Sequence, residues 1–185
     1  IKKESCEYDA LVEMNTTNLI RVIPDFPKPG IIFKDITPLL ANAAAFRQVS
    51  DQIAEHTSEV EYIAGIEARG FIFAAAVAAI SNKGLIPIRK SGKLPGKTFS
   101  NSYDLEYGKA TLEIHSDLIP TGGNVLLVDD VLATGGTALA AIDLIKMAGL
   151  NPVTIAFLLE IPALGGRSRI AKSHSALKIE TILAE

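Results

Sequence analysis

Two adjacent carboxylates followed by a Gly-Gly turn carry the clearest chemical signal in the sequence. The segment 125–137 reads VLLVDDVLATGGT, with Asp129 and Asp130 after an apolar run and Gly135 and Gly136 shortly afterwards. Glycines let the backbone approach an anion closely, and amides at the start of a following helix can surround a phosphate. The two carboxylates can accept hydrogen bonds from vicinal sugar hydroxyls. The pattern therefore favours a phosphate monoester joined to a ribose.

Triphosphate binding by this loop is disfavoured. The loop has no lysine, which a Walker A loop requires, and two carboxylates would repel a triphosphate unless a metal lay between them. Gly92–Thr98 resembles a Walker A motif only superficially, because three residues rather than four separate its glycines. Adjacent strand residues face opposite sides, so Asp129 and Asp130 can serve one ribose only if the strand ends there. A purely structural role, capping the strand-to-helix turn, stays open at this point.

Composition narrows the classes of protein. The 185 residues predict one domain with an appendage, and 48% hydrophobic with 21% charged residues excludes a disordered chain. A net charge of −3 excludes a general polyanion binder but allows a local basic pocket. With Cys6 as the only cysteine, an intrachain disulfide is impossible. The apolar stretch 71–80 is too short to span a bilayer and the charged N-terminus lacks a signal sequence, so we expect a soluble cytoplasmic protein without membrane or nucleic-acid partners.

The middle of the chain alternates between strand and helix patterns that must position the loop. Short apolar runs predict strands, and longer apolar-periodic runs predict helices. The expected strands are 62–66, 85–88, 111–115, 125–128 and 153–159; the expected helices are 70–81 and 137–148; residues 91–103 read as a polar loop. This order predicts an α/β fold with a mainly parallel sheet flanked by helices. Ligands of such sheets bind beyond the carboxyl ends of the strands, where the phosphate loop would lie.

The first 40 residues do not follow this alternation. Residues 8–23 predict a weak amphipathic helix interrupted near Thr16, and the proline-rich stretch 23–30 predicts a stiff extended connector. Residues 31–33 are strand-like, and Thr37-Pro38 is typical of a helix start. We expect residues 1–40 to form a small hood, paired in space with the tail after Glu160, and residues 41–185 to form the core.

The segment 125–137 resembles the signature of the type I phosphoribosyltransferases, which bind 5-phosphoribosyl-1-pyrophosphate (PRPP). The resemblance implies that Asp129 and Asp130 hold the ribose hydroxyls. It implies that the 5-phosphate is held by the loop residues Ala133, Thr134, Gly135, Gly136 and Thr137.

Four further segments narrow the resemblance to the adenine phosphoribosyltransferase family. They are PDFPKPGIIFKDITPLL (24–40), GIEARGF (65–71), IRKSGKLPG (88–96) and YDLEYG (103–108), in family order and spacing. The resemblance covers residues from about 19 to 170. It implies purine salvage: adenine and PRPP give AMP and pyrophosphate. It also implies Mg²⁺ held by substrate oxygens and water rather than by a protein cage, and a homodimer.

The resemblance implies that two segments bind the leaving group, pyrophosphate. Glu67, Ala68 and Arg69 follow a strand, open a helix and would grip pyrophosphate, with a cis peptide between the first two. Arg89, Lys90 and Lys93 form a basic cluster suited to the same anion.

The remaining roles concern the base. Residues 91–107 read as a flexible flap, in which Glu106 would act in proton transfer near the purine N7 and Tyr107 would help desolvate it. The Ile32 backbone would read the adenine edge, Phe33 would stack on the ring and Ile161 would line its other side. Lys34 stands where many family members carry arginine and is left outside the site.

Three rival functions can be weighed from the sequence. A phosphoribosyltransferase for another base, such as xanthine or guanine, is disfavoured by the hood segment 24–36. A non-catalytic sensor of PRPP would need a DNA-binding module, and residues 1–23 contain no basic helix-turn-helix segment. A structural or interaction protein leaves the acid pair and the Gly-Gly loop unexplained.

Overall fold

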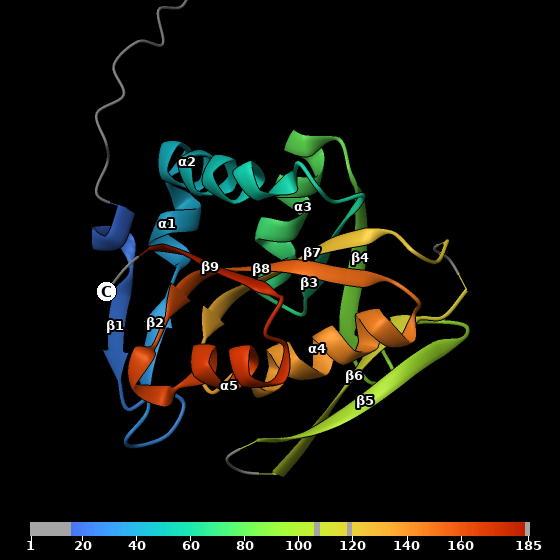
Figure 1. Cartoon of the computed structure of the whole chain (residues 1–185). Helices are drawn as coiled ribbons and strands as arrows, with labels where there is room; N and C mark the ends of the chain where they lie inside the picture. Colours follow the sequence, from blue (N-terminus) through green and yellow to red (C-terminus); the bar gives the residue numbers. More distant parts are fainter. Residues whose placement is uncertain (1–15, 106–107, 118–119, 184–185) are drawn as a thin grey trace, which may run out of the picture. The chain divides into compact units, whose positions relative to one another are not determined.

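A seven-stranded sheet organises the larger part of the chain. The computed structural model describes residues 16–105, 108–117 and 120–183 (Figure 1). The chain divides into two units, Ile1–Phe46 and Arg47–Glu185. Helix α2 (Ala43–Ala54) runs across the division, and each unit has its own sheet.

The sheet of the larger unit is mainly parallel, as predicted. Its strands are β3 (Tyr62–Ile66), β4 (Gly84–Lys90), β5 (Thr98–Leu105), β6 (Gly108–His115), β7 (Asn124–Leu132), β8 (Asn151–Glu160) and β9 (Lys178–Leu183). Their order is β5-β6-β4-β3-β7-β8-β9. Every pairing from β4 to β9 is parallel, and β6 and β5 add an antiparallel hairpin at one edge.

Helices cover both faces of this sheet. Figure 1 shows α3 (Gly70–Ser81) on one face, and α4 (Gly136–Met147) and α5 (Gly166–Ser173) on the other. Because both faces are covered, the central strand β7 is apolar at successive positions rather than at alternate ones. Within the described ranges, no helix is long and apolar enough to cross a membrane.

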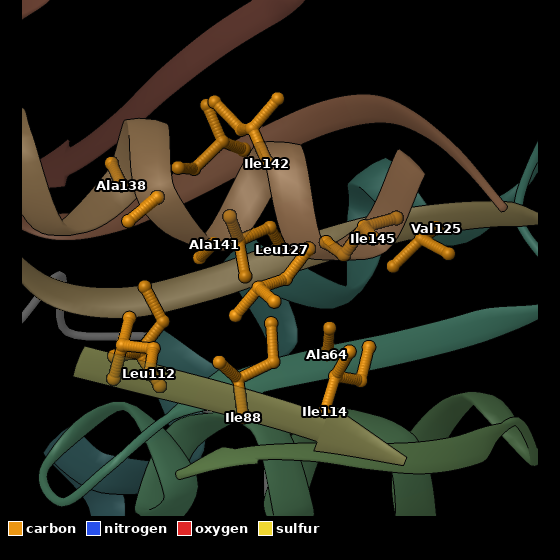
Figure 2. Packing of buried hydrophobic residues seen from close by; sticks show 14 of the residues in the cluster. Ala64, Ile88, Leu112, Ile114, Val125, Leu127, Ala138, Ala141, Ile142 and Ile145 are labelled. Atoms are coloured by element: carbon orange, nitrogen blue, oxygen red, sulfur yellow. The ribbon is translucent and has the colours of Figure 1, made fainter. Parts of the chain in front are cut away.

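The core beneath α4 fixes the position of the loop that precedes this helix. Leu127 of β7 packs with Ala64 of β3 and Ile88 of β4, and the α4 residues Ala141 and Ile145 lie in the same cluster (Figure 2). All five side chains are fully buried. Helix α4 is therefore anchored to the centre of the sheet.

The chain changes direction between β3 and β7. The units β3–α3–β4 and β7–α4–β8 extend from the sheet centre in opposite directions. Pairing of β7 with β3 ends at Val128, whereas pairing of β7 with β8 continues to Leu132. Strand β7 is thus longer than the expected 125–128, and it ends at the acid pair only with respect to β3, because β8 still pairs with it there. The sheet opens only on the β3 side, at the kind of switch point where α/β proteins bind ligands.

The smaller unit contains a two-stranded hairpin. The element η1 (Thr16–Leu19) is a 3-10 turn, followed by β1 (Arg21–Pro24), β2 (Ile32–Asp35) and α1 (Thr37–Ala41). The predicted helix 8–23 is therefore wrong in its described part, since the β-branched Val22 and Ile23 pair with β2. The predicted helix start at Thr37 is confirmed. Asp35 accepts hydrogen bonds from the Thr37 hydroxyl (2.6 Å), the Thr37 amide (2.9 Å) and Arg21 Nε (2.8 Å), and these contacts lower its pKa to about 2.

Two segments of the larger unit differ from expectation. Residues 98–103, expected as loop, begin strand β5, because Phe99 and Tyr103 pack against the core at alternate positions. The tail after Glu160 forms η3 (Pro162–Leu164), α5 and then β9, which pairs in parallel with β8. The tail is therefore part of the main sheet. A short 3-10 turn, η2 (Glu55–Thr57), precedes β3.

Replacing Leu127 by alanine should lower the free energy of unfolding by about 2–5 kcal/mol, because it leaves a cavity in the core beneath α4. Leu164→Ala is the matched control, since Leu164 is 43% exposed, and we expect a change of only about 0.5 kcal/mol. Urea unfolding at neutral pH measures both. Equal destabilisation by the two variants would contradict this description of the core.

Candidate active site

The predicted phosphate loop connects β7 to the N-terminus of α4. Gly135 has a φ of +78° and directly precedes α4, a backbone conformation that favours glycine. The loop encloses a small cavity of about 70 Å³, lined by residues 131–138 with Asp129 and Phe157. Backbone amides and the positive end of α4 border this cavity, which gives it the character of an anion site.

Gly166, which sequence reasoning missed, supports the loop from behind. A Cβ atom on Gly166 would lie 2.2 Å from the Ala133 carbonyl oxygen, so only glycine allows α5 to start this close to the loop. Arg169 of α5 also donates a hydrogen bond to the Thr134 carbonyl, at 3.4 Å. The Gly165-Gly166 pair in the sequence could have indicated this contact, but helix α5 was not predicted, so the pair could not be placed against the phosphate loop.

A larger open cavity of about 760 Å³ brings several predicted site residues together. Its lining contains the predicted residues Glu67, Ala68, Arg69, Lys90, Asp129, Asp130, Ala133 and Thr137. Tyr103, Ser91 and Thr111 also line it and were not predicted. One cavity therefore joins the loop after β3, the acid pair on β7 and the start of the phosphate loop.

Other predicted residues lie elsewhere. Arg89, Lys93 and Ile161 are not among the described residues that line this cavity, and the Ile161 amide donates to the Leu132 carbonyl at 2.8 Å. Thr134, Gly135 and Gly136 line the smaller cavity. Ile32 and Phe33 belong to the unit Ile1–Phe46, where Ile32 is 59% exposed and the Phe33 ring meets Phe26 edge-on. Glu106 and Tyr107 lie outside the described residues.

The acid pair is held by one arginine and one glycine. Arg69 Nε lies 2.7 Å from Oδ2 of the buried Asp130, an ion pair in which Oδ2 accepts no hydrogen bond from the described residues. Asp129 Oδ1 accepts a hydrogen bond from the Asp130 amide at 2.9 Å. A Cβ atom on Gly70 would lie 2.8 Å from Asp129 Oδ1, so this glycine lets α3 begin against the carboxylate.

Burial makes the acid pair costly to ionise. The pKa of Asp129 is raised well above its ordinary value, first by burial and then by the charge of Asp130. The pKa of Asp130 is also raised, because burial outweighs the attraction of Arg69. Such shifts are typical of functional sites, where charge is kept at the expense of stability.

Glu67 and Arg89 pair with each other. Glu67 accepts a hydrogen bond from Arg89 Nη2 at 3.0 Å and from the Lys90 amide at 2.9 Å, and the Arg89 contact lowers the pKa of Glu67. Arg89 Nη1 also donates to the Lys93 carbonyl at 2.9 Å. The pair ties the end of β3 to the end of β4, and it leaves Arg69 and Lys90 as the cations lining the cavity.

The loop after β3 has the expected backbone form. The peptide between Glu67 and Ala68 is cis, as the sequence resemblance indicated. Arg69 directly precedes α3, so the cavity-lining residues Glu67, Ala68 and Arg69 end where this helix begins.

The acid pair also offers carboxylate oxygens to a divalent cation in the cavity. Carboxylate oxygens are the ligands that Mg²⁺ prefers, and Asp130 Oδ2 is buried without a hydrogen bond from the described residues. Across those residues, no group of three or more His, Cys, Asp or Glu side chains is arranged to hold a metal ion. The two carboxylates are of the chemical type that such a cation binds, and Asp129 and Asp130 are the residues that would hold it here.

Replacing Asp129 by asparagine should stabilise the fold at pH 8, because it removes a buried charge. A raised folded-state pKa means that stability is lost as pH rises from the ordinary carboxyl range through the raised value. The advantage of Asp129→Asn should therefore shrink as pH falls toward about 4. Urea unfolding at both pH values tests this, with the exposed Asp117→Asn as control. A variant less stable than the parent at pH 8 would contradict it.

Comparison with known proteins places the chain in a family. The phosphoribosyl transferase domain model matches residues 34–183. The adenine phosphoribosyltransferase of Thermobifida fusca is 55% identical over 154 residues, covering 82% of this chain and 88% of that protein. The crystal structure of the Thermoanaerobacter pseudethanolicus enzyme superposes with a TM-score of 0.84 at 43% identity, covering 90% of this chain and 96% of that one.

A third relative was solved with a base bound. The adenine phosphoribosyltransferase of Saccharomyces cerevisiae, complexed with an imino-altritol bisphosphate and adenine, is 35% identical with a TM-score of 0.84. The alignment covers 93% of this chain and 100% of that one. The chain therefore belongs to the phosphoribosyltransferase domain family and, within it, to the adenine phosphoribosyltransferases.

Proposed function

We propose that this chain makes AMP and pyrophosphate from adenine and PRPP, a reaction of purine salvage, at the cavity between β3 and β7. The observation that carries the proposal is the shared lining of that cavity. Arg69, the acid pair Asp129–Asp130 and Thr137 of the phosphate loop all border it. These are the groups that an anionic leaving group, a ribose and a 5-phosphate require.

The ribose end is held from two sides in this proposal. The amides of residues 133–137 and the hydroxyls of Thr134 and Thr137 bind the 5-phosphate at the N-terminus of α4. The carboxylates of Asp129 and Asp130 accept hydrogen bonds from the ribose hydroxyls. Ribose binding then relieves part of the cost of burying these two carboxylates, because each gains donors.

The pyrophosphate end faces the cations of the cavity. Arg69 and Lys90 stabilise the negative charge that develops as the bond between C1 and the pyrophosphate oxygen lengthens. Glu67 and Arg89 act by holding the loop in place, and Lys93 joins this end through its backbone contact with Arg89. When bound with PRPP, Mg²⁺ supplies further neutralisation of the leaving group.

The base end depends on residues of the hood and the flap. N9 of adenine attacks C1 of the oxocarbenium-like ribosyl group, and the proton on the purine must leave. Glu106 takes part in this proton transfer, and Tyr107 and the flap 91–107 exclude water around it. Phe33 stacks on the ring, and Ile161 lines its other side.

Adenine is selected through the backbone of Ile32. Ile32 lies in the two-stranded β1–β2 hairpin, where alternate residues of each strand direct their backbone N–H and carbonyl away from the other strand, and in this proposal the Ile32 amide and carbonyl are directed in that way. That carbonyl can therefore accept a hydrogen bond from the 6-amino group, while the Ile32 amide donates to N1. A 6-oxopurine presents the opposite pattern, and one mispaired buried group costs about 1–3 kcal/mol, roughly tenfold to a hundredfold in rate.

We also propose that the enzyme works in the cytoplasm as a homodimer. Helix α3 is apolar on nearly every face, and Ile72 and Ile80 on its outer side are 39% and 38% exposed. An apolar helix with an exposed side is typical of a surface covered by a partner. The single cysteine of the sequence is compatible with a reducing compartment.

Pyrophosphate release with PRPP and Mg²⁺ should depend on adenine and be lost on replacing Glu106. We expect no release with hypoxanthine or guanine, and a fall of about 10²–10⁴-fold in kcat for Glu106→Ala, the usual contribution of proton transfer. Glu59→Ala, which removes an exposed glutamate, is the control. Turnover of 6-oxopurines would overturn the role of Ile32, and PRPP binding without turnover of any base would indicate a sensor instead.

The dimer proposal makes a separate prediction. The wild type should sediment with the mass of two chains at micromolar concentration, and Ile72→Glu with Ile80→Glu should convert it to single chains. Met147→Glu is the matched control, because Met147 is also exposed (48%) but lies on α4. A wild type that sediments as one chain would contradict the proposal.

A further inference from the structure

A row of side chains on β5 follows one face of helix α4. Thr137 Oγ1 donates a hydrogen bond to the Tyr103 hydroxyl at 3.2 Å. Asn101 Nδ2 lies 3.4 Å from the Ala140 carbonyl oxygen and 3.4 Å from Asp143 Oδ2. Alternate strand residues share a face, and helix residues three apart share a face. The contact of Tyr103 with Thr137 is therefore one end of a continuous strand–helix interface.

Tyr103 also lies within the site. Its side chain lines the same cavity as Thr137 and Asp129, and its ring packs against the hydrophobic core. The ring is thereby anchored, and the hydroxyl is held beside the first turn of α4. This hydrogen bond joins a hydroxyl of the cavity lining to a residue of the phosphate loop.

We infer that Tyr103 is a positioning residue, which holds Thr137 and with it the 5-phosphate site from strand β5. The inference rests on the proposed function in one respect, the role of Thr137 as a phosphate ligand. It adds a contact to the phosphate site from outside the phosphate loop.

The two hydroxyls can exchange the roles of hydrogen-bond donor and acceptor. A threonine hydroxyl can donate one hydrogen bond, and here Thr137 donates it to the Tyr103 hydroxyl oxygen. When a phosphate oxygen takes that proton, the Tyr103 hydroxyl can donate to Thr137 Oγ1 in return. A hydroxyl that donates to an anion becomes a better acceptor, so phosphate binding strengthens the Tyr103 contact.

Tyr103→Phe tests the inference while keeping the ring that packs in the core. We expect AMP to bind about three- to tenfold more weakly to this variant, the usual effect of losing one hydrogen bond, whereas adenosine, which lacks the phosphate, binds as to the wild type. In steady-state assays the KM for PRPP should rise, while kcat should change by less than about twofold, because the lost contact is made before the chemical step as well. Tyr62→Phe is the matched control, because the Tyr62 ring also packs against the core but Tyr62 is not part of the cavity lining, and it should change none of these quantities.

A double-mutant cycle separates coupling from general damage. In a Thr137→Ala background, Tyr103→Phe should weaken AMP binding by less than about twofold, because the partner hydroxyl is already gone. Wild-type AMP affinity in Tyr103→Phe, equal losses for AMP and adenosine, or effects that multiply in the double variant would each overturn the inference. If the wild type itself bound AMP no more tightly than adenosine, the proposed phosphate site would fail instead.

Discussion

The two carboxylates at the end of the β3–β7 contact set the main physical constraint on this protein. Asp129 and Asp130 are adjacent in sequence. Asp130 is buried and Asp129 is partly buried, and loss of solvent raises the pKa of both carboxyls. Such a pair is tolerated only where cations and donors surround it. Arg69 meets Asp130, the Asp130 amide meets Asp129, and the sheet opens beside both on the β3 side. The loop after β3, the start of α3 and the course of β7 are all arranged around these two charges.

Close backbone approach is the second requirement. Gly70 lets α3 begin against Asp129, and Gly166 lets α5 begin against the Ala133 carbonyl. In both places the absence of a side chain on glycine lets the N-terminus of a helix pack directly against the residues of the site. The phosphate loop itself needs glycine at Gly135 for its positive φ. The site is therefore formed by backbone as much as by side chains.

Local patterns in the sequence were enough to predict the centre of the fold but not its edges. The strand 62–66 and the helix 70–81 are correct to the residue, because a buried strand and an apolar helix have distinct lengths and periods. Strand β9 has a half-buried, partly polar pattern, and its pairing with β8 depends on tertiary contacts that no local window contains. Strand β5 was expected to be a loop for the same reason, since its side chains contact α4, which is distant in the sequence. The pairing of Glu67 with Arg89 joins residues 22 positions apart, and charge alone did not distinguish this pair from two separate ligands.

The opening of the sheet between β3 and β7 has a mechanical consequence. Beyond Val128, strand β7 stays with β8, while the chain after β3 turns away toward α3. The two halves of the sheet, β4–β3 and β7–β8, are therefore hydrogen-bonded to each other up to Val128 and separate beyond it. A ligand that contacts both the loop after β3 and the loop after β7 bridges the two halves. Its binding energy then helps to hold the halves of the sheet together, and without the ligand they are least firmly joined where the β3–β7 pairing ends.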